Sequence, residues 1–133
     1  MFDLAQRALA RPDLDQTQHL ESAPDGETEI ATTNANLDQV RQAHPEAAKA
    51  FGGLHAATIK PGVLGMKEKE LIALSIGIAK QCGDCIGFHV KAAIKASATR
   101  EEIVEAVCVS MMMDGGPSFM YGAKALEAYD QLA

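Results

Sequence analysis

The segment over residues 67–79 places large apolar side chains on nearly every face of the helix that its spacing predicts: Leu71, Ile72, Leu74, Ile76 and Ile78. A helix that is apolar all round has to be buried. Residues 103–113 have the same character, and two such helices are more than one core of about 100 residues can cover. The sequence therefore predicts an all-α fold, and a homo-oligomer in which another copy covers the remaining apolar faces.

Capping and helix-breaking residues mark the helix boundaries. Pro45 suits the first position of a helix because its missing N–H would have no partner there, and Lys60-Pro61-Gly62 ends this helix. Thr99-Arg100-Glu101-Glu102 has the pattern of a capping box, and Asp114-Gly115-Gly116-Pro117 breaks the helix that it opens. No segment has the alternation of a strand. We expect helices over residues 37–43, 45–59, 67–79, from Cys82 to about 97, 99–113 and 117–132.

Composition limits the class of protein. A chain of 133 residues suits one domain, and 47% hydrophobic residues are too many for a disordered protein. The net charge of −6 argues against a nucleic-acid partner. No apolar run approaches the roughly 20 residues of a membrane span, and the first 14 residues lack the apolar segment of a signal peptide. We expect a cytoplasmic protein that binds neither nucleic acid nor a membrane.

Most of the negative charge lies near the N-terminus. Residues 1–33 hold two arginines and seven acidic residues, and so carry −5 of the total charge of −6. Residues 15–36 have few large apolar side chains, which indicates a loop or an extended arm, and the first dozen residues suit a short helix. We therefore divide the chain into an acidic N-terminal arm over residues 1–33 and a helical domain over residues 34–133. The sequence assigns no role to the arm.

Two cysteines and a histidine form the most informative cluster of the chain. Cys82 and Cys85 are three residues apart, and His89 follows one helical turn after Cys85, on the same face. In a reducing compartment such a CxxC pair is more often redox-active or metal-binding than structural. The positive end of a helix stabilises the Cys85 thiolate and His89 can accept its proton, whereas the charge of Asp84 raises the pKa of a neighbouring thiol.

Other interpretations of these residues stay open at this point. The thiols can be unreactive, or half of a zinc site completed by His89 and by Cys108 or His55, although neither has the usual ligand spacing. Cys108 and Met111-Met112-Met113 suit a packed core. Glu70 suits the wet first turn of its helix; in a straight helix it would stand about 18 Å from Cys82, so it reaches the thiols only if the chain folds back or another subunit supplies it.

The spacing of Glu70, Cys82, Cys85 and His89 resembles the carboxymuconolactone decarboxylase superfamily, and within it the alkylhydroperoxidase D-like branch. The stretches Lys69-Glu70-Leu71-Ile72-Ala73-Leu74, Thr99-Arg100-Glu101-Glu102-Ile103 and Gly115-Gly116-Pro117 resemble it as well, and the likeness extends over residues 45–132. It implies an all-helical domain that assembles as a dimer, trimer or hexamer. It also implies a peroxidase that needs no metal, flavin or haem and is reduced by a dithiol, a thioredoxin-like protein or a lipoyl group.

The resemblance also implies a role for each residue. Cys85 would attack the peroxide and pass through a sulfenic acid, Cys82 would resolve it to a disulfide, and Glu70 and His89 would relay protons. The likeness departs at Asp84, where the best-known peroxidases of the branch have a histidine; the replacement removes a proton carrier, adds a repelling charge and bears on the rate. A lactone decarboxylase, which generally lacks the cysteine pair, and a non-catalytic redox-sensing or metal-binding oligomer are the alternatives.

Overall fold

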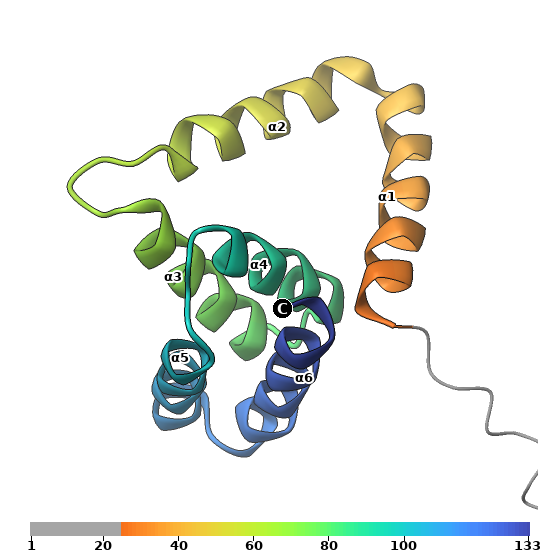
Figure 1. The fold of residues 1–133 in the computed structure, drawn as a ribbon. Helices are drawn as coiled ribbons and strands as arrows, with labels where there is room; N and C mark the ends of the chain where they lie inside the picture. The colour runs from red at the N-terminus through yellow and green to blue at the C-terminus, as the bar shows by residue number, and fades with distance from the viewer. Residues whose placement is uncertain (1–24) are drawn as a thin grey trace, which may run out of the picture.

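A computed structural model describes residues 25–133, and every regular element in this range is an α-helix. Helices α3 to α6 lie side by side as a bundle, α1 stands beside this bundle, and α2 leads from the end of α1 back to the start of α3 (Figure 1). None of these helices is long and apolar enough to cross a membrane. The expected all-α fold is confirmed. The bounds are α1 Gly26–Ala43, α2 Pro45–Ile59, α3 Met66–Ala79, α4 Gly83–Lys95, α5 Arg100–Asp114 and α6 Gly116–Leu132.

The core lies where α3, α4, α5 and α6 meet. Leu74 and Ile78 of α3 are fully buried, as are Ile86 and Val90 of α4 and Ile103 of α5. Burying one such side chain stabilises the fold by roughly 1.5–3 kcal/mol. The capping box also forms as expected, because the Thr99 hydroxyl accepts from the backbone of Glu102 and the Glu102 carboxylate accepts from the backbone of Thr99.

The expectation of a loop or arm over residues 15–36 is wrong for residues 26–36, which belong to α1. The helix begins because Asp25 accepts a hydrogen bond from the backbone N–H of Thr28 and acidic residues occupy the first turn. α1 continues without a break across residues 33 and 34. The short helix expected over the first dozen residues lies outside the described residues.

α1 is attached to the bundle by one apolar and several polar contacts. Ile30 is buried, the backbone N–H of Gly26 donates to Gln131 at 2.7 Å, and Glu27 pairs with Lys91 at 2.7 Å. α2 differs, because none of its residues is buried. His44 ends α1 and caps α2 by accepting from the backbone of Ala47, and Pro45 takes the first position of α2 as expected.

Several apolar residues that the sequence placed in the core are exposed. Ile72 and Ile76 of α3 are 48% and 56% exposed, so one subunit does not bury this helix on all faces. Cys108 is exposed and Met112 is 75% exposed. Their core placement was wrong because α5 buries its opposite face, through Ile103, Val107 and Ser110. Met113 is exposed as well, whereas Met111 packs against the core.

Candidate functional site

The CxxC pair lies at the turn that joins α3 to α4. The turn has the hydrogen bonds of a Schellman motif: the N–H of Cys82 donates to the carbonyl of Gly77 at 3.0 Å, and that of Gln81 to Ile78 at 3.0 Å. Gln81 takes the left-handed conformation that this motif requires, with φ of 55°. The motif directs the chain back along α3, so that α3 and α4 form an antiparallel hairpin (Figure 1).

Cys82 and Cys85 are joined as a disulfide, with Cα atoms 5.2 Å apart, so the structure is that of the oxidised protein. Cys82 is the N-cap of α4, and its sulfur accepts a hydrogen bond from the backbone N–H of Cys85 at 3.3 Å. Cys85 lies in the first turn of α4, as the sequence predicts. Both residues are partly exposed, so a small molecule can reach the pair from solvent.

Glu70 and His89 form the second half of the site. Glu70 is 3% exposed, and its Oε2 lies 2.7 Å from Nδ1 of His89, whose side chain is 24% exposed. As a carboxylate, Glu70 accepts this hydrogen bond from the Nδ1–H of His89, and in the neutral form of the imidazole Nε2 then carries the lone pair. The placement of Glu70 in a wet first turn was wrong, because the hairpin brings α4 over its side chain.

The hairpin thus brings the four predicted site residues to one pair of helices. Glu70 on α3 meets His89 on α4, Cys82 is bonded to Cys85, and His89 follows Cys85 by one turn on α4. Among the described side chains, no hydrogen bond joins the carboxylate–imidazole pair to the disulfide. The two are connected through α4, which carries both Cys85 and His89. Such an arrangement provides an electrophilic or nucleophilic sulfur next to a proton carrier.

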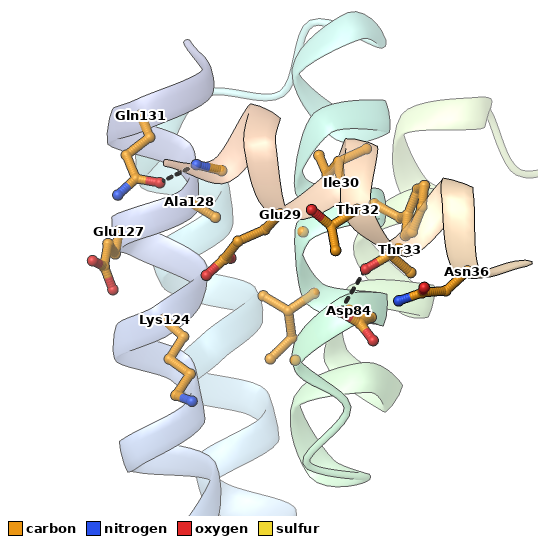
Figure 2. Close-up of a pocket in the computed structure, with 15 residues that line it drawn as sticks. Glu29, Ile30, Thr32, Thr33, Asn36, Asp84, Lys124, Glu127, Ala128 and Gln131 are labelled. Atoms are coloured by element: carbon orange, nitrogen blue, oxygen red, sulfur yellow. Dashed lines mark hydrogen bonds between the residues drawn. The ribbon is translucent and has the colours of Figure 1, made fainter. Parts of the chain in front are cut away.

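Asp84, between the two cysteines, is oriented towards α1. Its Oδ1 accepts a hydrogen bond of 2.9 Å from the hydroxyl of Thr33. Figure 2 shows this contact at the edge of a cavity of about 490 Å³ between α1, α4 and α6. Gly83 and Asp84 line the cavity, whereas the cysteines do not, and Glu29 and Lys124 add opposite charges to its wall. Asp84 therefore connects the cysteine-bearing start of α4 to α1.

Sequence reasoning missed two residues of the site. Thr33 was assigned to the arm, and nothing in its surroundings indicated a contact with Asp84. Gly77 was not considered, although a glycine inside an otherwise apolar helix indicates a close approach of another segment. The residues weighed for a metal site do not assemble: His55 and Cys108 are exposed on α2 and α5, and residues 25–133 contain no group of three metal-binding side chains.

Known proteins resemble the chain in both sequence and structure. The model of the carboxymuconolactone decarboxylase family matches residues 45–128. An uncharacterized protein of Cupriavidus necator is 38% identical over 108 residues, which cover 81% of this chain and 96% of the relative. A crystal structure of a carboxymuconolactone decarboxylase family protein from Legionella pneumophila is similar with a TM-score of 0.77 and 41% identity, covering 80% of this chain and 96% of that one.

A crystal structure from Thermotoga maritima has a TM-score of 0.71 and 26% identity, and covers 78% of this chain and 89% of that one. It is described as a carboxymuconolactone decarboxylase family protein for which a part in the antioxidative response is suggested.

Proposed function

The chain belongs to the carboxymuconolactone decarboxylase family, and we propose that within it the protein is a thiol-dependent peroxidase of the alkylhydroperoxidase D-like type. The observation that carries the proposal is the hairpin that places a redox-capable cysteine pair and the imidazole of His89 on α4, with the imidazole bonded to the buried carboxylate of Glu70 on α3. The antioxidative part suggested for the Thermotoga maritima relative favours the same chemistry.

The first step is the attack of the Cys85 thiolate on a peroxide oxygen. An S–O bond forms and the O–O bond breaks, so that the sulfur gives up two electrons and becomes a sulfenic acid. The departing alkoxide takes a proton and leaves as an alcohol. Because Cys85 lies in the first turn of α4, the partial positive charge of the helix N-terminus stabilises the thiolate.

The second step closes the disulfide that the oxidised structure contains. The thiol of Cys82 attacks the sulfenic sulfur of Cys85, the S–S bond forms, and hydroxide leaves with a proton as water. One peroxide and two thiols thus give an alcohol, water and a disulfide. An external dithiol, a thioredoxin-like protein or a lipoyl group then resets the pair by thiol–disulfide exchange and becomes a disulfide itself.

Glu70 and His89 supply the proton transfers. The carboxylate of Glu70 holds the proton of His89 on Nδ1, which leaves Nε2 able to take the Cys85 proton and return it to the alkoxide. Glu70 stabilises the imidazolium that forms in between. Its burial keeps water away from the carboxylate, and the hydrogen bond between the two fixes the orientation of the imidazole ring.

We further propose that the protein works as a homo-oligomer that buries α2. None of the residues of α2 is buried, and Phe51 and Leu54 are 73% and 63% exposed. Gly52 and Gly53 each cost a helix interior about 0.5–1 kcal/mol relative to alanine, yet among the described residues no atom beyond the local helix backbone lies within 4 Å of a Cβ added at either. Close approach of a second copy explains both features. Light scattering should give a multiple of the subunit mass, and Phe51→Glu should lower the measured mass.

The test of the activity is peroxide consumption by the purified protein with a dithiol as reductant. Cys85→Ser should abolish turnover, and Cys82→Ser, oxidised by peroxide without the dithiol, should stop at a Cys85 sulfenic acid that no internal thiol converts to a disulfide. Cys108→Ser is the matched control, since this exposed thiol lies outside the site on α5, and it should retain full activity.

Unchanged turnover in Cys85→Ser would overturn the peroxidase assignment. Decarboxylation of a carboxymuconolactone by the variant with both Cys82 and Cys85 changed to serine would favour the lactone enzyme. A change of assembly on oxidation with no peroxide turnover in the native protein would favour a redox sensor.

A further inference from the structure

Gly77 of α3 touches both cysteines of the site. Its carbonyl accepts the backbone N–H of Cys82 at 3.0 Å. Its Cα faces Cys85 so closely that an added Cβ would lie 3.3 Å from the Cβ of Cys85 and 3.8 Å from the backbone nitrogen of Ile86. Ordinary contacts between carbon atoms lie at about 3.5–4.0 Å, so a side chain here fits only if α4 gives way by a few tenths of an ångström.

The helix itself gives no reason for a glycine at this position. Gly77 lies inside α3, where glycine costs about 0.5–1 kcal/mol relative to alanine. Gly115 is the glycine with a left-handed backbone among the described residues, whereas Gly77 has the ordinary helical conformation that alanine also adopts. The contact with Cys85 remains as the physical reason for the missing side chain.

Gly77 also governs the pair of residues farther along the hairpin. Glu70 precedes it by seven residues, which is about two turns, so the two lie on the same face of α3 roughly 10.5 Å apart. On α4, Cys85 and His89 face this side, one at each end of the contact. The spacing between the helices at Gly77 therefore bears directly on the 2.7 Å contact between Glu70 and His89.

The geometry points to Gly77 as a positioning residue that sets the distance between the thiol helix α4 and the carboxylate on α3. A methyl group at this position pushes α4 outwards by about 0.2–0.7 Å, the difference between the available 3.3 Å and an ordinary contact. Cys85 and His89 move together because they share α4, so the displacement changes the contact between His89 and Glu70. This inference rests on the proposed thiol chemistry and adds a residue to it.

The experiment compares Gly77→Ala with the native protein in two assays over a range of pH. One is peroxide consumption with a dithiol; the other is the reaction of the reduced protein with Ellman's reagent, a disulfide that needs only a reactive thiol. All proteins in the comparison carry Cys108→Ser, because this exposed thiol would react with the reagent too. A displacement of 1 Å costs a catalytic step about 100-fold, so we expect kcat/KM for peroxide to fall roughly 3- to 20-fold. We also expect the pH profile of Cys85 to move to higher pH, because the proton acceptor is held less well.

Gly122→Ala is the matched control. Gly122 lies on α6, where an added Cβ would collide with a methyl group of Val107 on α5, away from the thiols. It should lower the thermal stability without moving either pH profile. Where Gly77→Ala does not fold alone, the same comparison is made in a Ser97→Gly background, since Ser97 has a left-handed φ of 70° that glycine adopts without strain.

The possible outcomes separate the role of Gly77 from the proposed function. A native protein that consumes peroxide, beside a Gly77→Ala variant with the same rate and the same two profiles, would overturn the role of Gly77 and leave the proposed function intact. A native protein without peroxide turnover would overturn the proposed function. In that case the profile with Ellman's reagent still decides the role of Gly77, because it should move in Gly77→Ala and stay in Gly122→Ala.

Discussion

The contact between Glu70 and His89 makes a quantitative prediction about stability. Glu70 is 3% exposed and the His89 side chain 24%, so little water screens their hydrogen bond of 2.7 Å. A hydrogen bond that involves a charged group contributes about 1.5–3 kcal/mol. A double-mutant cycle with Glu70→Leu and His89→Ala should therefore give a coupling energy of about 1.5–3 kcal/mol at pH 7.

The two single variants should not cost the same. His89→Ala leaves a buried carboxylate without its partner, which we expect to cost about 2–3 kcal/mol. Glu70→Leu replaces that carboxylate by an apolar group of similar volume and leaves the imidazole able to reach water, so it should cost less than about 1.5 kcal/mol. Stability is measured by urea unfolding of the oxidised protein at one fixed protein concentration, because oligomers gain stability with concentration. A coupling energy below about 0.5 kcal/mol, or a larger cost for Glu70→Leu than for His89→Ala, would refute this reasoning.

Two further predictions concern parts of the structure outside this pair. Gln81 and Ser97 both have left-handed backbone conformations, with φ of 55° and 70°, and each strains the chain by about 1–2 kcal/mol. Glycine removes this strain but has a larger unfolded-state entropy, so the net gain in stability is roughly 0.5–1 kcal/mol. Gln81→Gly and Ser97→Gly should therefore each raise the urea midpoint of unfolding, and a lower midpoint would contradict this. Hydrogen bonds from the Arg100 guanidinium at 2.8 and 3.0 Å hold the pKa of Asp130 below its ordinary value of 3.8. A carboxyl group whose pKa is lower in the folded state stabilises the fold above its unfolded pKa, and this stabilisation is lost as the pH falls through its folded pKa. Asp130→Asn should therefore lower the melting temperature at pH 7 but no longer do so well below pH 3.8. A difference in melting temperature between the variant and the native protein that persisted there would contradict the assignment.

Local sequence patterns predicted the helices well where their boundaries carry a chemical marker. Pro45, the capping box at Thr99 and the break at Gly115 all mark ends that the structure has within one or two residues. The patterns did not predict which apolar faces one subunit buries. Met112 and Ile103 are equally suited to a core by composition, yet one is 75% exposed and the other fully buried, because the direction in which α5 faces its neighbours is a tertiary property.

The start of α1 was missed for a different reason. Residues 26–36 have few large apolar side chains, so their periodicity is weak, and the helix depends on the Asp25 cap and on a single buried anchor, Ile30. Contacts between segments far apart in the sequence, such as that of Thr33 with Asp84, leave no local pattern at all. Position in the chain and composition alone therefore assigned residues 26–36, the first part of α1, to a loop or an arm.

The site depends on one turn that the sequence conceals. The left-handed residue of a Schellman motif is usually glycine, but this position is Gln81, so nothing local indicated that the chain reverses between α3 and α4. Once the reversal is known, the spacing of Glu70, Cys82, Cys85 and His89 has a geometric meaning, because it places the carboxylate and the imidazole at the same height on two antiparallel helices. Inserting one residue into the turn would disrupt the Schellman hydrogen bonds from Gln81 to Ile78 and from Cys82 to Gly77, and so the register of α4 against α3 that brings His89 to Glu70. The length of the turn over residues 80–82 therefore belongs to the proposed chemistry as much as the four side chains do.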